Sequence, residues 1–264
     1  MEALVFLKLG GSLITDKRRA ETPRREVIAR LAREIGEALK AAPDLRLVLG
    51  HGAGSFGHWA ARQYGTRQGV HTQEEWLGYA KVAAAAARLH RIVADICLEA
   101  GLPVVSFQPS ASALCWKGTL RTLAIYPIHV VLEHGLIPLV YGDVALDLAQ
   151  GGTIVSTEEL FAHIAQRLRP ARILLAGEAA GVYDLQGAVI PTITPADLPA
   201  LRPALAGSEA PDVTGGMAAK VEAMLALVQA HPGLQVHIFS GREPGLLTQV
   251  LLHPDLPVGT HIHA

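Results

Sequence analysis

Three glycine-rich turns, two of them with a lysine close by, are the parts of this chain best suited to chemistry. The first is KLGGS (residues 8–12), followed by Lys17. The second is HGAGSFGH (residues 51–58), and the third is DVTGGMAAK (residues 212–220), which ends at Lys220. Glycines let a backbone approach a ligand closely, and N–H groups at the start of a following helix attract anions. Three such turns predict a large polyanion, and a nucleoside triphosphate is the simplest candidate.

Two common phosphate-binding motifs do not explain the second turn. Residues 52–57 satisfy GxGxxG, but the dinucleotide fingerprint also needs an acidic residue at the end of a second strand. Glu74 and Glu75 have the distance, yet they lie at the start of a predicted helix. A P-loop needs Gly-Lys-Ser/Thr, whereas Gly57 is followed by His58 and Trp59. The turn is predicted to bind an anion, but through neither of these two motifs.

Strands and helices that alternate along the chain must position these turns. Apolar runs and helical periodicity predict strands at 3–9, 45–49, 103–107, 137–141, 173–176 and 235–239, and helices at 24–41, 55–64, 74–100, 125–134, 158–169, 216–231 and 245–252. Ser55 is a candidate N-cap for its helix. The stretch 192–212, rich in Pro, Ala and Leu, is predicted to be a boundary or a mobile loop. This order predicts an α/β protein with a mostly parallel sheet covered on both faces, whose ligands collect where strands end.

Composition narrows the classes of function. The chain has 264 residues, half of them hydrophobic, and a formal net charge of -1, which indicates a globular protein and argues against nucleic acid or an anionic membrane as partner. Cys97 and Cys115 are too few for a disulfide framework and are expected to be free thiols. The N-terminal residues lack the pattern of a signal peptide, and no apolar run is long enough for a membrane span, so we expect a cytoplasmic protein.

Five blocks, in order, resemble those of the amino acid kinase superfamily, and most of all those of the isopentenyl phosphate kinases. They are KLGGSLITDK (8–17), HGAGSFGH (51–58), GDVALD (142–147), GVYD (181–184) and DVTGGMAAK (212–220). The resemblance spans nearly the whole chain. It implies a single domain with a three-layer αβα sandwich, in which residues of about 1–150 bind the acceptor and those of about 151–264 bind the nucleotide.

The resemblance implies the reaction of ATP with isopentenyl phosphate to give ADP and isopentenyl diphosphate. Catalysis would rest on aligning two anions and neutralising charge in transfer. Lys8 and Lys17 would contact the transferring phosphoryl group, Lys220 would reach the ATP phosphates, and His58 would anchor the acceptor phosphate. The other expected contacts are Gly10, Gly11, Ser12, Gly54, Glu158, Gly181, Asp184 and Gly215 for the nucleotide, and Gly52, Ala53, Gly54 and Asp143 for the acceptor.

The resemblance also implies Mg²⁺ bound mainly by ATP oxygens and water, no dedicated metal site in the protein, and a homodimer. The sequence departs from the family at two places. Glu158 stands where the family has the aspartate that is thought to orient the lysines, so the charge is kept and the geometry is in question. The nucleotide loop reads GEAAGVYD (177–184) instead of TDVDGVYD, which leaves the base preference open.

Other interpretations remain open at this point. Lys8 and Lys17 could be surface lysines, Asp143 a turn residue, and His51 a structural residue that bonds loop backbone; His261 and His263 have strand spacing rather than a metal pattern. Ala83, Ala84, Ala86 and Ala87 could leave room for a longer prenyl tail or only allow close helix packing, and we expect dimethylallyl and geranyl phosphates to react less efficiently. A kinase of another phosphorus oxyanion such as fosfomycin, or a non-catalytic nucleotide sensor, are the alternatives.

Overall fold

The computed structural model describes residues 4–206 and 216–264, with the backbone alone at His58 and 204–206. Its main feature is an eight-stranded sheet in the order β10-β12-β11-β9-β1-β2-β6-β3. The strands are β1 (Leu4–Leu9), β2 (Arg46–His51), β3 (Val104–Ser106), β6 (Ile137–Tyr141), β9 (Arg172–Gly177), β10 (Thr192–Ile193), β11 (Gln235–Ser240) and β12 (Thr260–Ile262). Neighbouring strands from β3 to β11 are parallel, and β12 runs antiparallel to β11.

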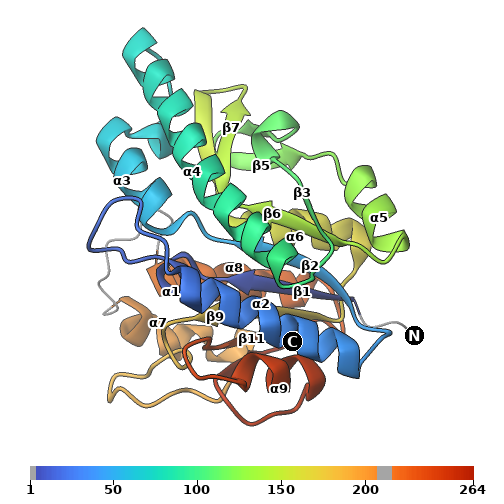
Figure 1. Cartoon of the computed structure of the whole chain (residues 1–264). Coiled ribbons are helices and arrows are strands. Elements are labelled where there is room, and N and C mark those ends of the chain that lie inside the picture. Colours follow the sequence, from blue (N-terminus) through green and yellow to red (C-terminus); the bar gives the residue numbers. More distant parts are fainter. Residues whose placement is uncertain (1–3, 207–215) are drawn as a thin grey trace.

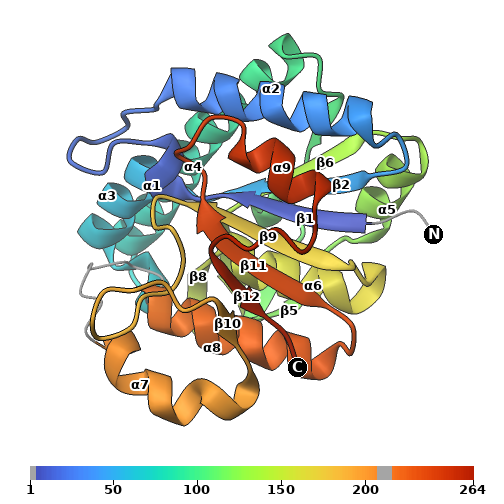
Figure 2. The ribbon, with the colours of Figure 1, turned by 90° about the horizontal axis from the view of Figure 1, so that it is seen from below.

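Helices cover both faces of this sheet (Figures 1 and 2). On one face, α2 (Arg25–Ala41), α4 (Gln73–Glu99) and α9 (Leu246–Leu252) pack on the sheet. The other face carries α5 (Tyr126–Glu133), α6 (Thr157–Leu168), α7 (Leu198–Ala206) and α8 (Gly216–Ala230). Because both faces are buried, β1 is apolar from Leu4 to Leu7, with Phe6 in one core and Leu7 in the other. The predicted three-layer α/β class is confirmed.

A second, four-stranded sheet stands beside the first in the order β5-β4-β7-β8. It contains β4 (Leu114–Trp116), β5 (Thr119–Thr122), β7 (Asp143–Asp147) and β8 (Gly151–Val155). The sequence analysis did not predict it, because these strands are only three to five residues long and partly polar. Its β7 begins two residues after β6 ends, so the sheet carries Asp143 to the end of the central sheet.

Two short elements follow the ends of β1 and β2 and form the turns of interest. They are α1 (Gly11–Ile14) and α3 (Gly54–Tyr64). The prediction of Ser55 as N-cap of α3 is wrong: Ala53 takes that position, without a side-chain cap. Ser55 is buried instead, where its N–H donates to Thr15 Oγ1 (2.8 Å) and its hydroxyl accepts the Thr22 N–H (3.1 Å).

The stretch 192–212 is predicted to be a boundary or a mobile loop; a loop is wrong for residues 192–206, and residues 207–212 lie outside the described part of the chain. Residues 192–206 form β10, a 3₁₀ turn at Pro195–Asp197, and α7. Thr194 and Asp197 form a capping box that starts this turn, a local signal that the high Pro content obscured. The remaining 3₁₀ turns are Thr66–Gln68 and Pro109–Ala111. Within the described residues, no helix is both long and apolar enough to cross a bilayer.

Candidate active site

A cavity of about 970 Å³ opens where β1, β2 and β9 end. It receives residues from every predicted block that the structure describes. Among the predicted site residues, those that line it are Lys8, Gly10, Gly11, Ser12, Lys17, Gly52, Ala53, Gly54, Asp143, Glu158, Gly181, Asp184 and Lys220. The His58 side chain and Gly215 lie outside the described part of the chain. The turns far apart in sequence therefore meet at one site, as parallel-sheet topology requires.

Glu158 holds two of the predicted lysines at this site. Its carboxylate forms a close ion pair with Lys8 Nζ, and its other oxygen lies 3.8 Å from Lys220 Nζ. Lys8 comes from β1, Glu158 from the first turn of α6, and Lys220 from α8. Burial alone would raise the pKa of the Glu158 carboxyl, but the charges of Lys8 and Lys220 outweigh it and lower that pKa to about 2. Glu158 is therefore an anion that fixes two cations, and its extra methylene still allows both contacts.

The first turn of α6 presents Glu158 because of a capping box. Ser156 Oγ accepts the Glu159 N–H (3.2 Å), and the Glu159 carboxylate accepts the Ser156 N–H (2.6 Å). Glu159 also pairs with Arg67 through two hydrogen bonds of 2.9 and 3.1 Å. Glu159, the second of the two adjacent glutamates, thus stabilises the start of α6, and Glu158 faces the lysines. Sequence reasoning missed Arg67, since nothing local links it to α6.

The first two glycine turns pack directly against each other. A Cβ on Gly11 would lie 2.5 Å from the Gly54 nitrogen, and one on Gly52 would lie 2.8 Å from the Gly11 nitrogen. Thr15 joins the turns, since its hydroxyl donates to the Gly11 carbonyl (2.7 Å) and accepts the Ser55 N–H (2.8 Å). Gly54 also has φ of 51°, which favours glycine. Glycine is required here so that two backbones can form one wall of the cavity.

Asp143 lines the cavity and is buried. Its carboxylate accepts the N–H groups of Ser110 (3.2 Å) and Val144 (2.8 Å). Burial raises the pKa of this carboxyl, and its hydrogen bonds, including one from the Tyr141 hydroxyl, oppose that shift. Asp143 is therefore a fixed acceptor of backbone N–H groups and not a solvent-exposed turn residue.

The end of the cavity between α3 and α4 is apolar. Ala61, Val82, Ala86 and Ile154 line it. Of the four alanines considered in the sequence, Ala86 lines the cavity and Ala84 is exposed. One of these four alanines therefore lines the cavity, and the rest of this apolar lining comes from Ala61, Val82 and Ile154.

The altered nucleotide loop is tied to the first glycine turn. Arg24 donates to Glu178 (2.6 Å) and to the Ser12 carbonyl (3.0 Å). Asp184 accepts the N–H groups of Gln186 (2.9 Å) and Ala188 (2.8 Å), which closes its own turn. Glu178, in the first of the family's aspartate positions, thus gains a partner from the residue before α2. The Arg24 contact was not predicted, because the two residues are far apart in the chain.

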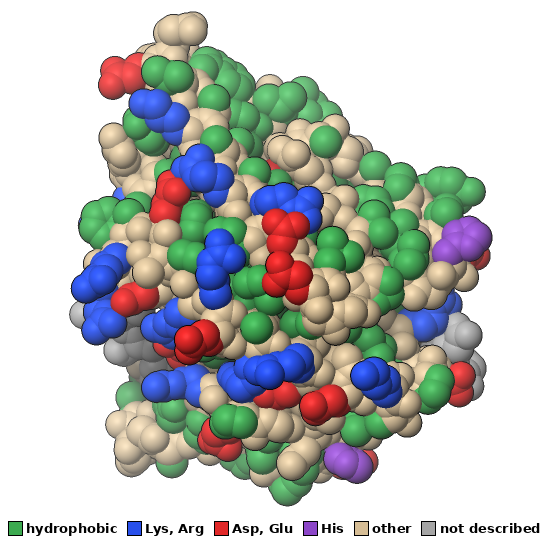
Figure 3. Space-filling view, in the orientation of Figure 1, with side chains coloured by type: hydrophobic (Ala, Val, Ile, Leu, Met, Phe, Trp, Pro, Cys, Tyr) green, Lys and Arg blue, Asp and Glu red, His purple; other side chains and the backbone are tan. Residues whose placement is uncertain are grey.

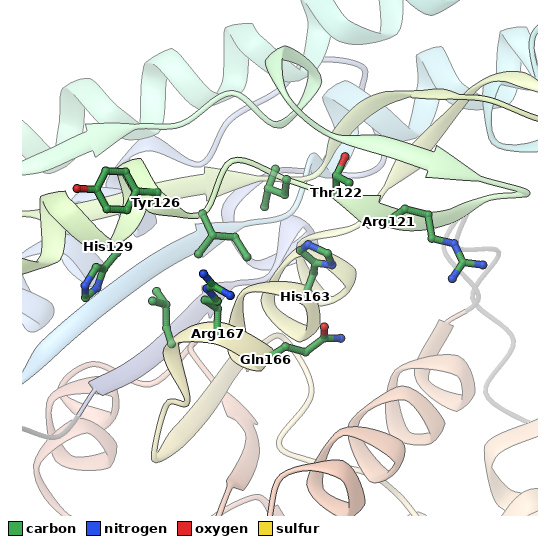
Figure 4. Close-up of a pocket in the computed structure, with 10 residues that line it drawn as sticks. Arg121, Thr122, Tyr126, His129, His163, Gln166 and Arg167 are labelled. Atoms are coloured by element: carbon green, nitrogen blue, oxygen red, sulfur yellow. The ribbon is translucent and has the colours of Figure 1, made fainter.

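A second cavity, of about 760 Å³, lies apart from these turns, between β5, α5 and α6 (Figure 4). Tyr126 and His129 come from α5, and His163, Gln166 and Arg167 from the end of α6. None of its described lining residues belongs to a glycine turn, and none is a lysine or a carboxylate. On the face seen in Figure 3, basic and acidic side chains are interspersed. The motifs that could do chemistry converge on the larger cavity.

The chain resembles known proteins over nearly its whole length. The sequence profile of the amino acid kinase family matches residues 3–240. The isopentenyl phosphate kinase of Methanothermobacter thermautotrophicus is 35% identical over 271 residues, with 98% of each chain covered. That of Haloferax volcanii is 38% identical, with 90% of this chain and 91% of the other covered.

A solved isopentenyl phosphate kinase structure superimposes with a TM-score of 0.83 at 31% identity, and the match covers 98% of this chain and 99% of the other. The fold and family expected from the five blocks are therefore confirmed. The chain belongs to the amino acid kinase family, and within it to the isopentenyl phosphate kinases.

Proposed function

We propose that this protein transfers the γ-phosphoryl group of ATP to the phosphate of isopentenyl phosphate. An acceptor phosphate oxygen attacks the γ-phosphorus, the bond from that phosphorus to the β–γ bridging oxygen breaks, and ADP leaves with isopentenyl diphosphate as product. The observation that carries the proposal is a single cavity with a lysine–carboxylate–lysine cluster at its polar end and an aliphatic wall at its other end. A prenyl phosphate matches this division between charge and hydrocarbon.

The lysines would supply most of the catalysis. The acceptor oxygen is already anionic, so no strong base is needed, and the barrier lies in bringing two anions together. Lys8, Lys17 and Lys220 would offset that repulsion and the charge on the phosphoryl group in transfer. Glu158 would keep Lys8 and Lys220 in place while leaving their remaining N–H groups for phosphate oxygens.

The acceptor would bind against the second glycine turn, within the part of the chain from 1 to about 150. The N–H groups of Gly52, Ala53 and Gly54 would receive phosphate oxygens, as in other anion-binding backbone turns. His58 would donate a further hydrogen bond, stronger when the imidazole is protonated beside a dianion. Asp143 would hold the floor of this half, and the tail would lie against Val82 and Ala86.

The nucleotide would occupy the other half, formed mainly by residues from about 151 to 264. Gly10, Gly11 and Ser12 would contact the phosphates, together with Gly215 and Lys220 from the third turn. Gly181 and Asp184 would border the nucleoside. Glu158 contacts Lys8 from the first half of the chain and Lys220 from the second, and these contacts support a role for it between the two substrates.

MgATP is the expected form of the phosphoryl donor. Among the described residues, no group of three or more His, Cys, Asp or Glu could hold a metal ion. Glu158 is engaged by lysines and Asp143 by backbone N–H groups. This donor set fits Mg²⁺ that is bound chiefly by phosphate oxygens and water. The family resemblance further supports a homodimer in the cytoplasm as the working form.

An acceptor panel tests the proposal. ADP release with MgATP is measured for isopentenyl phosphate, dimethylallyl phosphate, fosfomycin and N-acetylglutamate. We expect kcat/KM to be highest for isopentenyl phosphate and to fall about 100-fold in His58→Ala. His129→Ala, which removes an exposed imidazole of α5, is the matched control and should retain activity. Preference for fosfomycin or N-acetylglutamate would contradict the proposal, and full activity of His58→Ala would remove His58 from it.

A further inference from the structure

Two buried histidines lie directly behind the second glycine turn, and the proposed chemistry does not use them. His51 ends β2, immediately before Gly52, and is fully buried; His90 reaches it from α4. His51 Nε2 lies 3.1 Å from His90 Nδ1. Both rings stack on Tyr141, with centroid distances of 5.7 Å for His51 and 4.1 Å for His90. The rings thus form a rigid layer under the turn.

One carbonyl group determines where the protons of this pair reside. His51 Nδ1 lies 3.2 Å from the Gly52 carbonyl oxygen, which can only accept, so His51 carries its proton on Nδ1. Its Nε2 is then a lone-pair acceptor, and His90 must donate to it from Nδ1. His90 Nε2 is left without a proton, and within the described residues this buried atom has no hydrogen-bond partner.

The hydrogen bond from His51 to the Gly52 carbonyl also sets the direction of the next backbone N–H, that of Ala53. A trans peptide points its C=O and the following N–H in opposite directions. Because His51 holds the Gly52 carbonyl on its own side, the Ala53 N–H is turned to the other side, in a stretch whose residues Gly52–Gly54 line the cavity. This is the N–H that the proposed function assigns to a phosphate oxygen.

The backbone carbonyl of His51 also contacts residues next to Glu158 and Asp143. Its carbonyl accepts the Thr157 hydroxyl (2.6 Å) and the Gly142 N–H (3.2 Å). Thr157 is the first residue of α6 and precedes Glu158, while Gly142 precedes Asp143. His51 therefore contacts the acceptor turn, the start of α6 and the beginning of β7. It is the residue at which these three elements are joined.

We propose that His51 and His90 are a positioning pair, each with its proton on Nδ1, that aims the Ala53 N–H at the acceptor phosphate. The proposal rests on the proposed function for its kinetic part. The groups that face the pair are Lys8 on β1, Arg91 on α4, Tyr141 at the end of β6 and Asp143 at the start of β7. Burial in this setting lowers the pKa of His51 to about 4 and of His90 to about 3, so both rings stay neutral in the working range.

Tautomer measurement tests the pair without any substrate. Long-range ¹H–¹⁵N correlation of the imidazole nitrogens, assigned by loss of signals in His51→Asn and His90→Leu, should show both rings protonated on Nδ1 and unprotonated on Nε2 at pH 7. A proton on Nε2 of either ring, or a charged ring, overturns the proposal. This result does not depend on which acceptor the enzyme uses, so it is separable from failure of the proposed function.

Kinetics test the positioning role. His51→Leu removes the donor to Gly52 and should raise KM for isopentenyl phosphate about tenfold, with KM for MgATP unchanged. His51→Asn places an amide N–H near the position of Nδ1 and should restore KM to within about threefold of the wild type. His237→Phe alters another buried, stacked histidine away from the cavity and is the matched control.

Thermal unfolding of each variant separates position from stability. Loss of activity that follows only the folded fraction, with KM unchanged, would overturn the positioning role. Equal KM in His51→Leu and His51→Asn would overturn it as well. If His51→Leu does not fold, the tautomer measurement on the wild type still decides the hydrogen-bond chain, and His90→Leu provides the kinetic comparison with an expected rise in KM of about threefold.

Discussion

At the scale of one residue, Glu158 shows how a glutamate can contact two lysines where the family resemblance implies an aspartate. The carboxylate is nearly buried, where an unpaired charge would be costly, yet Lys8 and Lys220 keep it ionised. Its side chain is one methylene longer than that of the aspartate usual in relatives. Both lysines are nevertheless within ion-pair distance. The longer side chain therefore keeps the charge and both lysine contacts.

We expect Glu158→Gln to lower kcat about 100-fold, because Lys8 and Lys220 lose the anion that holds them and repel each other. KM for isopentenyl phosphate should change little. Glu158→Asp keeps the charge, and its kcat should be at least tenfold higher than that of Glu158→Gln. Steady-state kinetics with MgATP and isopentenyl phosphate measure both effects.

The matched control is Glu222→Gln, which neutralises an exposed carboxylate two positions after Lys220 on α8. It should behave as the wild type. If Glu158→Gln retains wild-type kcat, the lysines do not depend on Glu158, and the proposed arrangement of the site is wrong.

At the scale of elements, the first residues of α1 and α3, Gly11 and Gly54, pack backbone against backbone. Gly11→Ala would put a methyl group against the backbone of Gly54, which cannot move away as a side chain can. We expect this variant to lose at least 100-fold in kcat/KM, as phosphate-binding backbone shifts. Gly36→Ala, in α2, is the control: its Cβ would make an ordinary 3.7 Å contact with Leu102, and the change should stabilise the protein by about 0.5–1 kcal/mol.

Activity and thermal unfolding of the two alanine variants provide the comparison. Wild-type kcat/KM in Gly11→Ala would mean that the turns can separate without cost, contrary to the close packing described here.

Most of the large elements could be predicted from the sequence, because their signals are local. The periodicity of residues 25–41 and 73–99 and the apolar runs of β1 and β9 survive in the structure nearly as predicted. The second sheet could not be, since its strands pair across the chain and carry little alternation of their own. Ser55 was misplaced for a related reason: its partners, Thr15 and Thr22, come from another turn.

The site divides in the same way. Lys8, Lys220 and the glycines were predicted because each sits in a recognisable block. The contact of Glu158 with the lysines was implied by the family resemblance alone, and the Arg24–Glu178 pair and the approach of His90 to His51 were not predicted; all three contacts are long-range. They depend on how β1, α6, α8 and α4 are placed, which no single stretch of sequence specifies.

At the scale of the whole molecule, buried neutral histidines couple stability to pH. Burial lowers the pKa of His51 and His237 to about 4 and that of His90 to about 3. In the unfolded chain these imidazoles titrate near their ordinary value, so on acidification the unfolded state takes up protons that the native state does not. The contribution of these three histidines to the free energy of unfolding is therefore fully present above about pH 6.5, and it is lost as the pH falls towards 4. Asp143, whose pKa burial raises, works in the opposite direction.

The lowered pKa values of the three histidines predict that the free energy of unfolding falls by about 3–5 kcal/mol between pH 6.5 and pH 5. Urea unfolding at half-unit steps of pH measures this, and His237→Phe should reduce the slope by about a third. A urea midpoint that stays constant across this range would contradict the neutral, buried state of the three rings.

The most direct measurement is ³¹P NMR of the reaction with MgATP and isopentenyl phosphate. We predict that the single resonance of the acceptor disappears as two mutually coupled doublets of isopentenyl diphosphate grow, in step with the formation of ADP. ATP that turns into ADP and inorganic phosphate while the acceptor resonance stays unchanged would contradict phosphoryl transfer to a prenyl phosphate.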